Sequence, residues 1–311
     1  MPSSNTNDLR GYPIALLSAV VLSTTAIFVR YLTETYHLPA LVLAFWRALF
    51  AVCTLLLILG IFKPGLLKVT RSQLAYLAIF GVILALFNSL WTLSVALNGA
   101  AVSNVLVYSS TGFTVLLGWL ILKEQLTWVK IGAVVFCLGG MVFVSQALDP
   151  SVWSVNMGGI LTGIFSGLMY AIYSMMGRSA SQRGLNPWTT LFYTFCFDTV
   201  LLGLVNLLPL GIPGTAAVPS EFFWLGTTWA GWGILLLLAA GPTVLGYGLY
   251  NVSLTFLPSS TVNLIVTLEP AFTAVLAYFF LGERLTAVQL AGSLLILGAV
   301  VLLRIHEGRL A

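Results

Sequence analysis

The strongest constraint on this chain is a series of apolar segments, each long enough to cross a lipid bilayer as a helix. A hydrocarbon core about 30 Å thick requires about 20 helical residues. Ten such segments lie at residues 12–31, 39–60, 74–95, 101–121, 128–146, 157–177, 188–209, 229–251, 260–281 and 286–303. The sequence therefore predicts an all-α membrane protein with ten transmembrane helices.

The composition excludes a soluble globule. Of the 311 residues, 59% are hydrophobic and 7% are charged, and the mean hydropathy is +1.03. So few charged side chains cannot cover a surface in water, whereas lipid accepts an apolar surface. The three cysteines, Cys53, Cys137 and Cys196, lie within apolar segments and indicate neither a disulfide framework nor a metal cluster. We expect no cofactor, no metal and no nucleic-acid partner.

Basic residues predict the orientation of the chain. Ten crossings bring both termini to one face, and only Arg30 and Arg284 lie in loops of the opposite face, while Arg47 lies within a span. The basic residues of the terminal face are Arg10, Lys63, Lys68, Arg71, Lys123, Lys130, Arg178, Arg183, Arg304 and Arg309. Because cytoplasmic loops carry the excess of Lys and Arg, we expect both termini in the cytoplasm and the protein in the cytoplasmic membrane.

The second half of the chain repeats the first. An LxExLT pattern around Glu124 recurs around Glu283, 159 residues later, and a Phe-Thr pair precedes it in both places. Each half has five crossings, so the second half enters the membrane from the opposite face. The sequence predicts two inverted repeats, residues 1–146 and 147–311, around a central cavity, as in many secondary transporters.

Small residues at every fourth position mark the first span of each half. The stripe of span six and its counterpart in span one are Gly159, Gly163 and Gly167, and Gly11, Ala15 and Ala19. Such stripes let membrane helices approach closely. The alternative is chance in helices rich in Ala and Gly. We expect the stripes to hold spans one and six together.

Two long segments resemble the EamA domains of the drug/metabolite transporter superfamily. They are NVLVYSSTGFTVLLGWLILKEQLTWVKIGAVVFCLGGMVFV and NLIVTLEPAFTAVLAYFFLGERLTAVQLAGSLLILGAVVLL, and FWRALFA in the second span adds to them. The resemblance implies two five-helix bundles, a cavity lined mainly by spans 1, 3, 4, 6, 8 and 9, and export of small metabolites, often amino acids. The LEP triplet at 268–270 corresponds to SST at 109–111, so a two-fold pair of proton-binding acids is not expected.

Three charged side chains lie deep within the spans, away from their ends, where an unpaired charge costs at least about 2.5–3.5 kcal/mol. Glu269, just before Pro270, is a candidate proton carrier or partner of a substrate amine; the alternative is a carboxyl that supports a helix kink. Arg47 is a candidate partner of a substrate carboxylate, and a structural bond is its alternative. For Asp198 we expect a structural partner.

Polar and aromatic residues at helical spacing are the candidate cavity lining. They are Asn88, Trp91, Tyr108, Ser110, Tyr173, Tyr247, Tyr250, Asn263 and Glu269. Polar groups that face lipid are left unsatisfied, so we expect these faces to point into the bundle; hydrogen bonds between helices are the alternative for each. Gly and Pro in GPTVLGYGLYN of span eight indicate a hinge or a broken helix. Lys123–Glu124 and Glu283–Arg284 are candidate gate latches, or side chains that reach the interface.

These features favour a transporter and not an enzyme. We expect it to move a small polar metabolite, such as an amino acid, by alternating access, with export as the expected direction. Its partners are then the solute, the bilayer and, through Glu269, protons. Efflux of drugs or cationic compounds and a facilitative permease are the alternatives of the same class. An intramembrane enzyme requires a nucleophile with a base or a metal set, and no His/Cys/Asp cluster is visible; a non-transporting receptor or a channel is the remaining alternative. No GxxxxGK[ST] loop is present for nucleotide-driven pumping.

Overall fold

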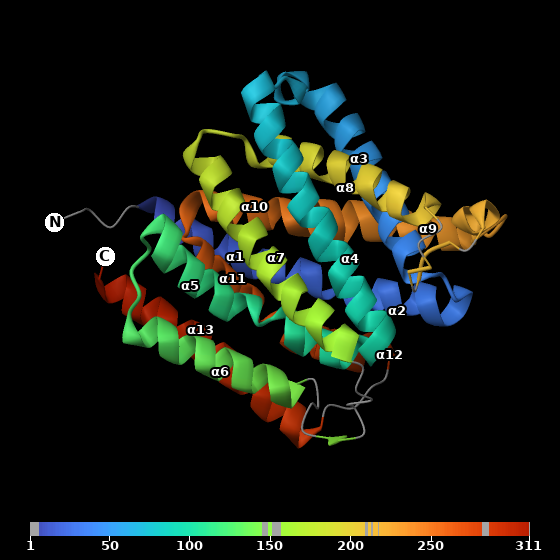
Figure 1. Cartoon of the computed structure of the whole chain (residues 1–311). Helices are drawn as coiled ribbons and strands as arrows, with labels where there is room; N and C mark the ends of the chain where they lie inside the picture. Colours follow the sequence, from blue (N-terminus) through green and yellow to red (C-terminus); the bar gives the residue numbers. More distant parts are fainter. Residues whose placement is uncertain are drawn as a thin grey trace.

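The computed structural model describes residues 6–144, 149–150, 157–208, 211–212, 214–216, 218–281 and 286–310, which form helices and no strand. The elements of the first half are α1 (Thr6–Ser23), α2 (Thr25–Tyr36), α3 (Ala40–Phe62), η1 (Pro64–Leu67), α4 (Arg71–Val107), α5 (Ser110–Leu122) and α6 (Trp128–Val144). Those of the second half are α7 (Met157–Gln182), α8 (Pro187–Leu207), η3 (Pro219–Phe223), α9 (Trp229–Leu238), η4 (Ala239–Gly246), α10 (Tyr247–Phe256), α11 (Ser259–Val266), α12 (Glu269–Leu281) and α13 (Ala287–Leu310) (Figure 1).

Seven helical stretches of the described chain are long and apolar enough to cross a membrane, and two shorter apolar helices, Trp128–Val144 and Ala287–Leu302, accompany them. One stretch joins α1 to α2, and another joins α9, η4 and α10. The predicted span 260–281 is divided between α11 and α12, because the chain forms a turn at Thr267 and Leu268. The prediction of an all-α, multi-pass membrane protein is confirmed.

Helix α4 contains a reversal of the chain. A straight α-helix separates residues nine positions apart by about 13.5 Å along its axis. The hydroxyls of Ser94 and Ser103, nine positions apart, are 2.9 Å from each other. The chain therefore turns back between them, at the place where the sequence predicts the end of span 74–95 and the start of span 101–121.

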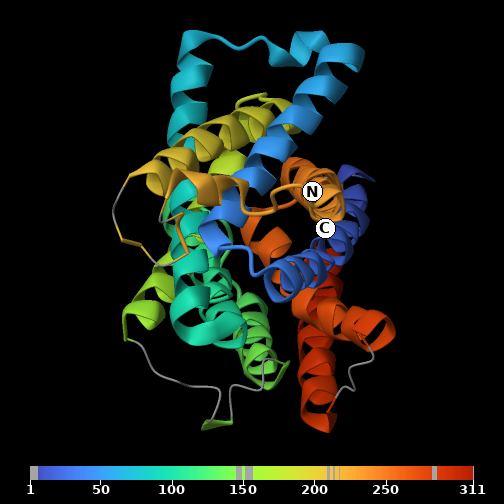
Figure 2. The same ribbon diagram turned by 90° about the vertical axis from the view of Figure 1, so that its right-hand side faces the viewer.

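Two views place the remaining helices. The start of α1, the end of α13 and the connection from α5 to α6 lie on the same side of the molecule, at the left of Figure 1. Helices α6 and α13 run side by side along one edge. Figure 2 shows the α3–α4 connection at one end of the molecule and the start of α13 at the other. The site described below lies between α1, α2, α3, α4, α7, α10 and α12, and none of its lining residues comes from α6 or α13.

The stripes of small residues join helices of different halves. A Cβ atom on Gly163 of α7 would lie 2.6 Å from Leu106 Cδ1 and 2.7 Å from Ser94 Oγ, both in α4. A Cβ atom on Gly11 of α1 would lie 2.6 Å from Leu257 Cγ, at the end of α10. Our expectation that the stripes hold spans one and six together was therefore wrong. The stripe of α7 instead meets residues on both sides of the reversal in α4, in spans three and four, and Gly11 meets the end of α10.

Span eight is interrupted as the sequence indicates. Its middle, η4, is a π-helix that contains Pro242. Proline has no N–H to donate to the carbonyl four residues earlier, and the hydroxyl of Thr243 donates to that carbonyl, Leu238 O, at 3.0 Å. Ser18 of α1 donates to the Gly246 carbonyl at 2.9 Å. The irregular turn is thus satisfied by side chains and lies against α1, beside the site.

Replacement of Gly163 by Ala tests the close approach of α7 and α4. We expect it to lower the free energy of unfolding by about 1–3 kcal/mol, because the added methyl group overpacks the contact with α4. The measurement is the thermal unfolding midpoint of the purified protein in detergent. Gly139→Ala is the matched control, since no atom lies within 4 Å of a Cβ there. Equal midpoints for the two variants would contradict the close packing.

Candidate functional site

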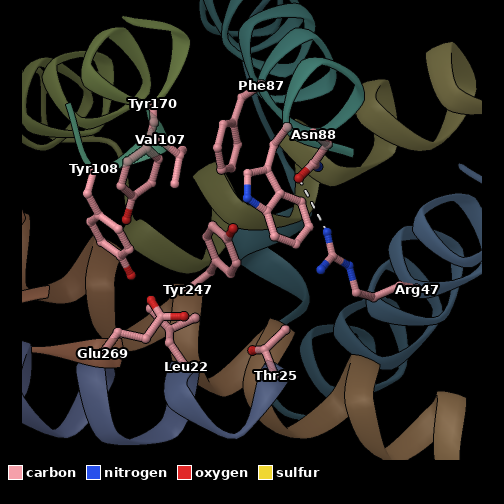
Figure 3. A pocket seen from close by; sticks show the side chains of 11 residues that line it. Leu22, Thr25, Arg47, Phe87, Asn88, Val107, Tyr108, Tyr170, Tyr247 and Glu269 are labelled. Atoms are coloured by element: carbon pink, nitrogen blue, oxygen red, sulfur yellow. Dashed lines mark hydrogen bonds between the residues drawn. The ribbon is translucent and has the colours of Figure 1, made fainter. Parts of the chain in front are cut away.

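A pocket opens between the helices of the two halves (Figure 3). It encloses about 90 Å³, room for several water molecules. The side chains that line it are Leu22, Thr25, Arg47, Phe87, Asn88, Trp91, Val107, Tyr108, Tyr170, Tyr247 and Glu269. They come from α1, α2, α3, α4, α7, α10 and α12, and from the turn after α4. These elements belong to spans 1, 3, 4, 6, 8 and 9, which the family resemblance implies, and to span 2 through Arg47.

The pocket brings together six of the side chains predicted from the sequence, namely Asn88, Trp91, Tyr108, Tyr247, Glu269 and Arg47. Four others, Ser110, Tyr173, Tyr250 and Asn263, lie outside its lining. The sequence analysis did not select Leu22, Thr25, Phe87, Val107 and Tyr170. Helical periodicity indicates which face of a span points inward. It does not indicate which turn of that face borders the pocket, because all turns of one face have the same spacing. Apolar and small lining residues carry no signal that separates them from the core.

An amide links two of the three charged side chains within the spans. Arg47 Nη2 donates to Asn88 Oδ1 at 3.3 Å, drawn dashed in Figure 3. Asn88 Nδ2 donates to Asp198 Oδ2 at 2.9 Å. A guanidinium only donates and a carboxylate only accepts, and a side-chain amide satisfies both. This chain of bonds joins α3, α4 and α8 and provides the structural partner expected for Asp198.

The third charged side chain, Glu269, lies on the other side of the pocket. Figure 3 shows its carboxyl and the Arg47 guanidinium on opposite sides, with the Tyr247 ring between them. The Tyr108 hydroxyl is directed at the carboxyl and interacts with it. Glu269 is the first residue of α12 and Pro270 follows it. The start of a helix suits both, since the dipole favours a carboxylate and proline is tolerated in the first turn.

Stacked aromatic rings form the wall of the pocket on the α7 side. Phe87 and Tyr170 have ring centroids 5.0 Å apart and an interplanar angle of 27°. Tyr170 in turn stacks on Tyr250 at 5.9 Å and on Tyr173 at 6.3 Å. The Tyr250 hydroxyl is hydrogen bonded to Ser174 Oγ at 2.5 Å. Tyr173 and Tyr250 are fully buried behind the lining, so they support the wall and do not contact the pocket space.

A polar seam between α5 and α11 continues from the pocket. Asn263 Nδ2 of α11 donates to Thr114 Oγ1 of α5 at 2.6 Å. Ser110 and Thr111, one turn earlier in α5, are fully buried. Every residue of α11 is buried. The seam therefore closes the space between the pocket and the side of the molecule on which α5 ends.

Hydrogen bonds between side chains hold the end of this seam that lies farther from the pocket, and we call them the clamp at Glu124. Glu124 Oε1 accepts hydrogen bonds from the Ser259 backbone N–H at 3.1 Å and from Ser259 Oγ at 2.9 Å. Its other oxygen accepts from Ser260 Oγ, to which Lys130 Nζ also donates at 3.0 Å. Of the two candidate latches, the one at Glu124 thus joins the two halves. The one at Glu283 and Arg284 lies outside the described residues.

Unpaired polar atoms gather around the pocket and the seam. In the described part of the chain, the buried side-chain atoms without a hydrogen-bond partner are Arg47 Nε, Ser110 Oγ, Thr111 Oγ1, Asp198 Oδ1, Asn251 Nδ2 and Asn263 Oδ1. Buried polar groups are normally paired, and of these six residues Arg47 belongs to the pocket lining. Across the same ranges, no group of three or more His, Cys, Asp or Glu side chains is placed to hold a metal ion.

Comparisons with known proteins agree with this arrangement. The model of the EamA-like transporter family matches residues 9–146 and 157–305. The threonine/homoserine exporter RhtA of Escherichia coli is 28% identical over 247 residues, which cover 79% of this chain and 75% of that protein. A transporter of Archaeoglobus fulgidus is 25% identical over 296 residues, 94% of this chain and 95% of that protein. A crystal structure with 15% sequence identity shares the fold, with a TM-score of 0.76 over 97% of this chain and 98% of the other.

Proposed function

Because the chain belongs to the EamA-like transporter family, and is thus a multi-pass membrane transporter and not an enzyme, we propose that it exports an amino acid or a similar small amphiphile. The observation that carries the proposal is the pair of opposite charges on the two sides of one pocket. Arg47 offers donors to a carboxylate, and Glu269 offers acceptors to an ammonium group. RhtA, a relative, is by name an exporter of threonine and homoserine, which supports this class of cargo.

The chemistry of a zwitterion fits this arrangement. A charged group that leaves water loses its hydration and must be paired in the site. Arginine binds carboxylates well because its planar fork donates two parallel hydrogen bonds. The rings of Trp91 and Tyr247, together with Phe87, leave an apolar surface between the charges for a small side chain. Both ends of an amino acid therefore find a partner in the pocket.

Efflux of cationic compounds is the second candidate, because aromatic rings and a carboxylate also suit a cation. The Arg47 guanidinium in the same pocket is the observation against it, since a cation gains nothing from it. A facilitative permease has the same site and differs only in coupling. Glu269 is the proposed proton carrier, as the one acid of the described chain that lines the pocket.

For the mechanism, we propose that residues 1–146 and 147–311 are inverted repeats whose rocking exposes the pocket to each side in turn. Support comes from the two close helix contacts, since each joins the first span of one half to a helix of the other half. The excess of basic residues on the terminal face supports cytoplasmic termini. The clamp at Glu124 then closes the cytoplasmic route to the pocket.

Analogues of threonine that lack one charged group test the cargo. We expect threonine to drive counterflow in liposomes. 1-Amino-2-propanol, which lacks the carboxylate, and 3-hydroxybutyrate, which lacks the amine, should each compete about tenfold less well. A site that pairs a polar group discriminates strongly against an analogue without it. Equal competition by the amine would instead support efflux of cations.

Glu269→Gln separates proton-coupled transport from facilitated diffusion. Glutamine keeps the size and the hydrogen-bonding capacity of the side chain but binds no proton in this range of pH. If Glu269 carries the proton, we expect the variant to lose accumulation driven by a pH gradient. Counterflow should remain measurable at higher solute concentrations, because the glutamine amide oxygen still accepts a hydrogen bond from the ammonium group. Uptake by the variant with the same pH profile as the unmodified protein would show that Glu269 is not the carrier.

A cysteine reporter in the seam tests the clamp and the orientation together. With Thr111→Cys as the reporter, we expect Glu124→Gln to accelerate labelling by a membrane-impermeant maleimide roughly tenfold in inside-out vesicles. Loss of hydrogen bonds to a charged group, about 1.5–3 kcal/mol each, favours the open seam. Faster labelling in right-side-out vesicles would reverse the orientation, and unchanged labelling in both would contradict the clamp.

Two glycines of α5 provide a matched pair for the same assay. A Cβ atom on Gly118 would lie 2.9 Å from Glu124 Oε2, so Gly118→Ala displaces the carboxylate without removing it. On Gly112 the nearest atom to a Cβ is Val134 Cγ1, at 3.8 Å. We expect Gly118→Ala to accelerate labelling as Glu124→Gln does, and Gly112→Ala to leave it unchanged.

A further inference from the structure

Asp198 is bonded to the pocket although it is not part of the lining. It is fully buried in α8, and its contact with the site runs through Asn88, which lines the pocket. Arg47, at the other end of the same amide, interacts electrostatically with it. A buried carboxylate requires a counter-charge, and here that counter-charge, Arg47, is itself part of the pocket lining. A change at Asp198 therefore changes the charge balance of the pocket.

The charges of the site are unequal when Asp198 is counted with the lining. In the described chain, the charged side chains that line the pocket or are bonded to its lining through this amide are Arg47, Asp198 and Glu269. With both acids ionised, their formal charges sum to −1. Each extra negative charge inside the membrane is costly, because the surrounding dielectric is low and Coulomb energies are correspondingly large. A solute with a net negative charge therefore meets a pocket that already carries that charge.

We infer that Asp198 determines the charge selectivity of the site: it balances Arg47, so that the pocket rejects solutes with a net negative charge. The inference rests on the proposed function, since it concerns the cargo of the same pocket. Arg47 remains able to bind the carboxylate of a zwitterion, because it lines the pocket and its bond to Asn88 uses Nη2. Asn88 transmits the balance, since its amide is held by Asp198 with the carbonyl toward Arg47.

Asp198→Asn isolates the charge from the geometry. The amide oxygen of asparagine can accept the bond from Asn88 Nδ2, so the variant retains the shape of the site and loses one negative charge. In proteoliposomes, we expect the ratio of aspartate uptake to threonine uptake to rise about tenfold. Aspartate is the net anion of this pair and threonine is the neutral zwitterion. Asp198→Glu, which keeps the charge, is the control, and we expect it to exclude aspartate as the unmodified protein does.

A double variant distinguishes charge balance from a loosened structure. Arg47→Gln together with Asp198→Asn gives the pocket the same net charge as the unmodified protein. We expect it to unfold at a higher temperature than Asp198→Asn alone, because the single variant leaves a buried cation without its counter-charge. The unfolding temperature is the readout here, since Arg47 is also the proposed partner of the solute carboxylate. A variant that is merely loosened is not repaired by a second substitution.

The outcomes separate this inference from the proposed function. If the unmodified protein takes up neither amino acid, the proposed cargo is wrong. The charge balance between Arg47 and Asp198 is then tested by comparing the unfolding temperatures of the double variant and Asp198→Asn. A double variant no more stable than Asp198→Asn then overturns it. If threonine is taken up and Asp198→Asn still excludes aspartate, the inference is wrong and the cargo stands.

Discussion

The structure depends on one constraint: in a hydrocarbon solvent, every polar group must be paired within the protein. The chain has few charged residues, and those within the spans cannot face lipid at tolerable cost. Arg47 and Asp198 meet part of this demand through the amide of Asn88, and Glu269 lies at the start of a helix beside Tyr108. The same requirement draws amides, hydroxyls and tyrosines to one interior region. The pocket that we propose as the solute site therefore lies where polar groups are buried together, away from lipid.

Close helix contacts determine where that region lies. Glycines of α7 let it rest on the end of α4, and Gly11 lets α1 rest on the end of α10. Both contacts bridge the two halves of the chain, so the pocket is walled by helices of both. The π-helical turn of span eight lies against α1 and ends just before Tyr247, which projects into the pocket. Packing and site are thus built from the same few helices.

The pocket and the seam suit different tasks. Around the pocket, opposite charges and aromatic rings are arranged about an open space, which suits the binding of a solute. Along the seam, Asn263 and Thr114 pair directly, and Glu124 holds the first residues of α11. Hydrogen bonds of this kind are strong enough to keep a route closed and few enough to be exchanged when helices move.

The sequence by itself determined the solvent of this protein, its helical class and the side chains that require partners. Those properties follow from segment length, hydropathy and the cost of buried charge, which are local. Only the tertiary structure decided that Asn88 joins Arg47 to Asp198, that Tyr170 and not Tyr173 lines the pocket, and that the glycine stripes bridge the halves. These outcomes depend on how each helix is rotated about its axis and which neighbour it meets. The sequence does not fix either property, because residues on every face of a helix recur with the same spacing.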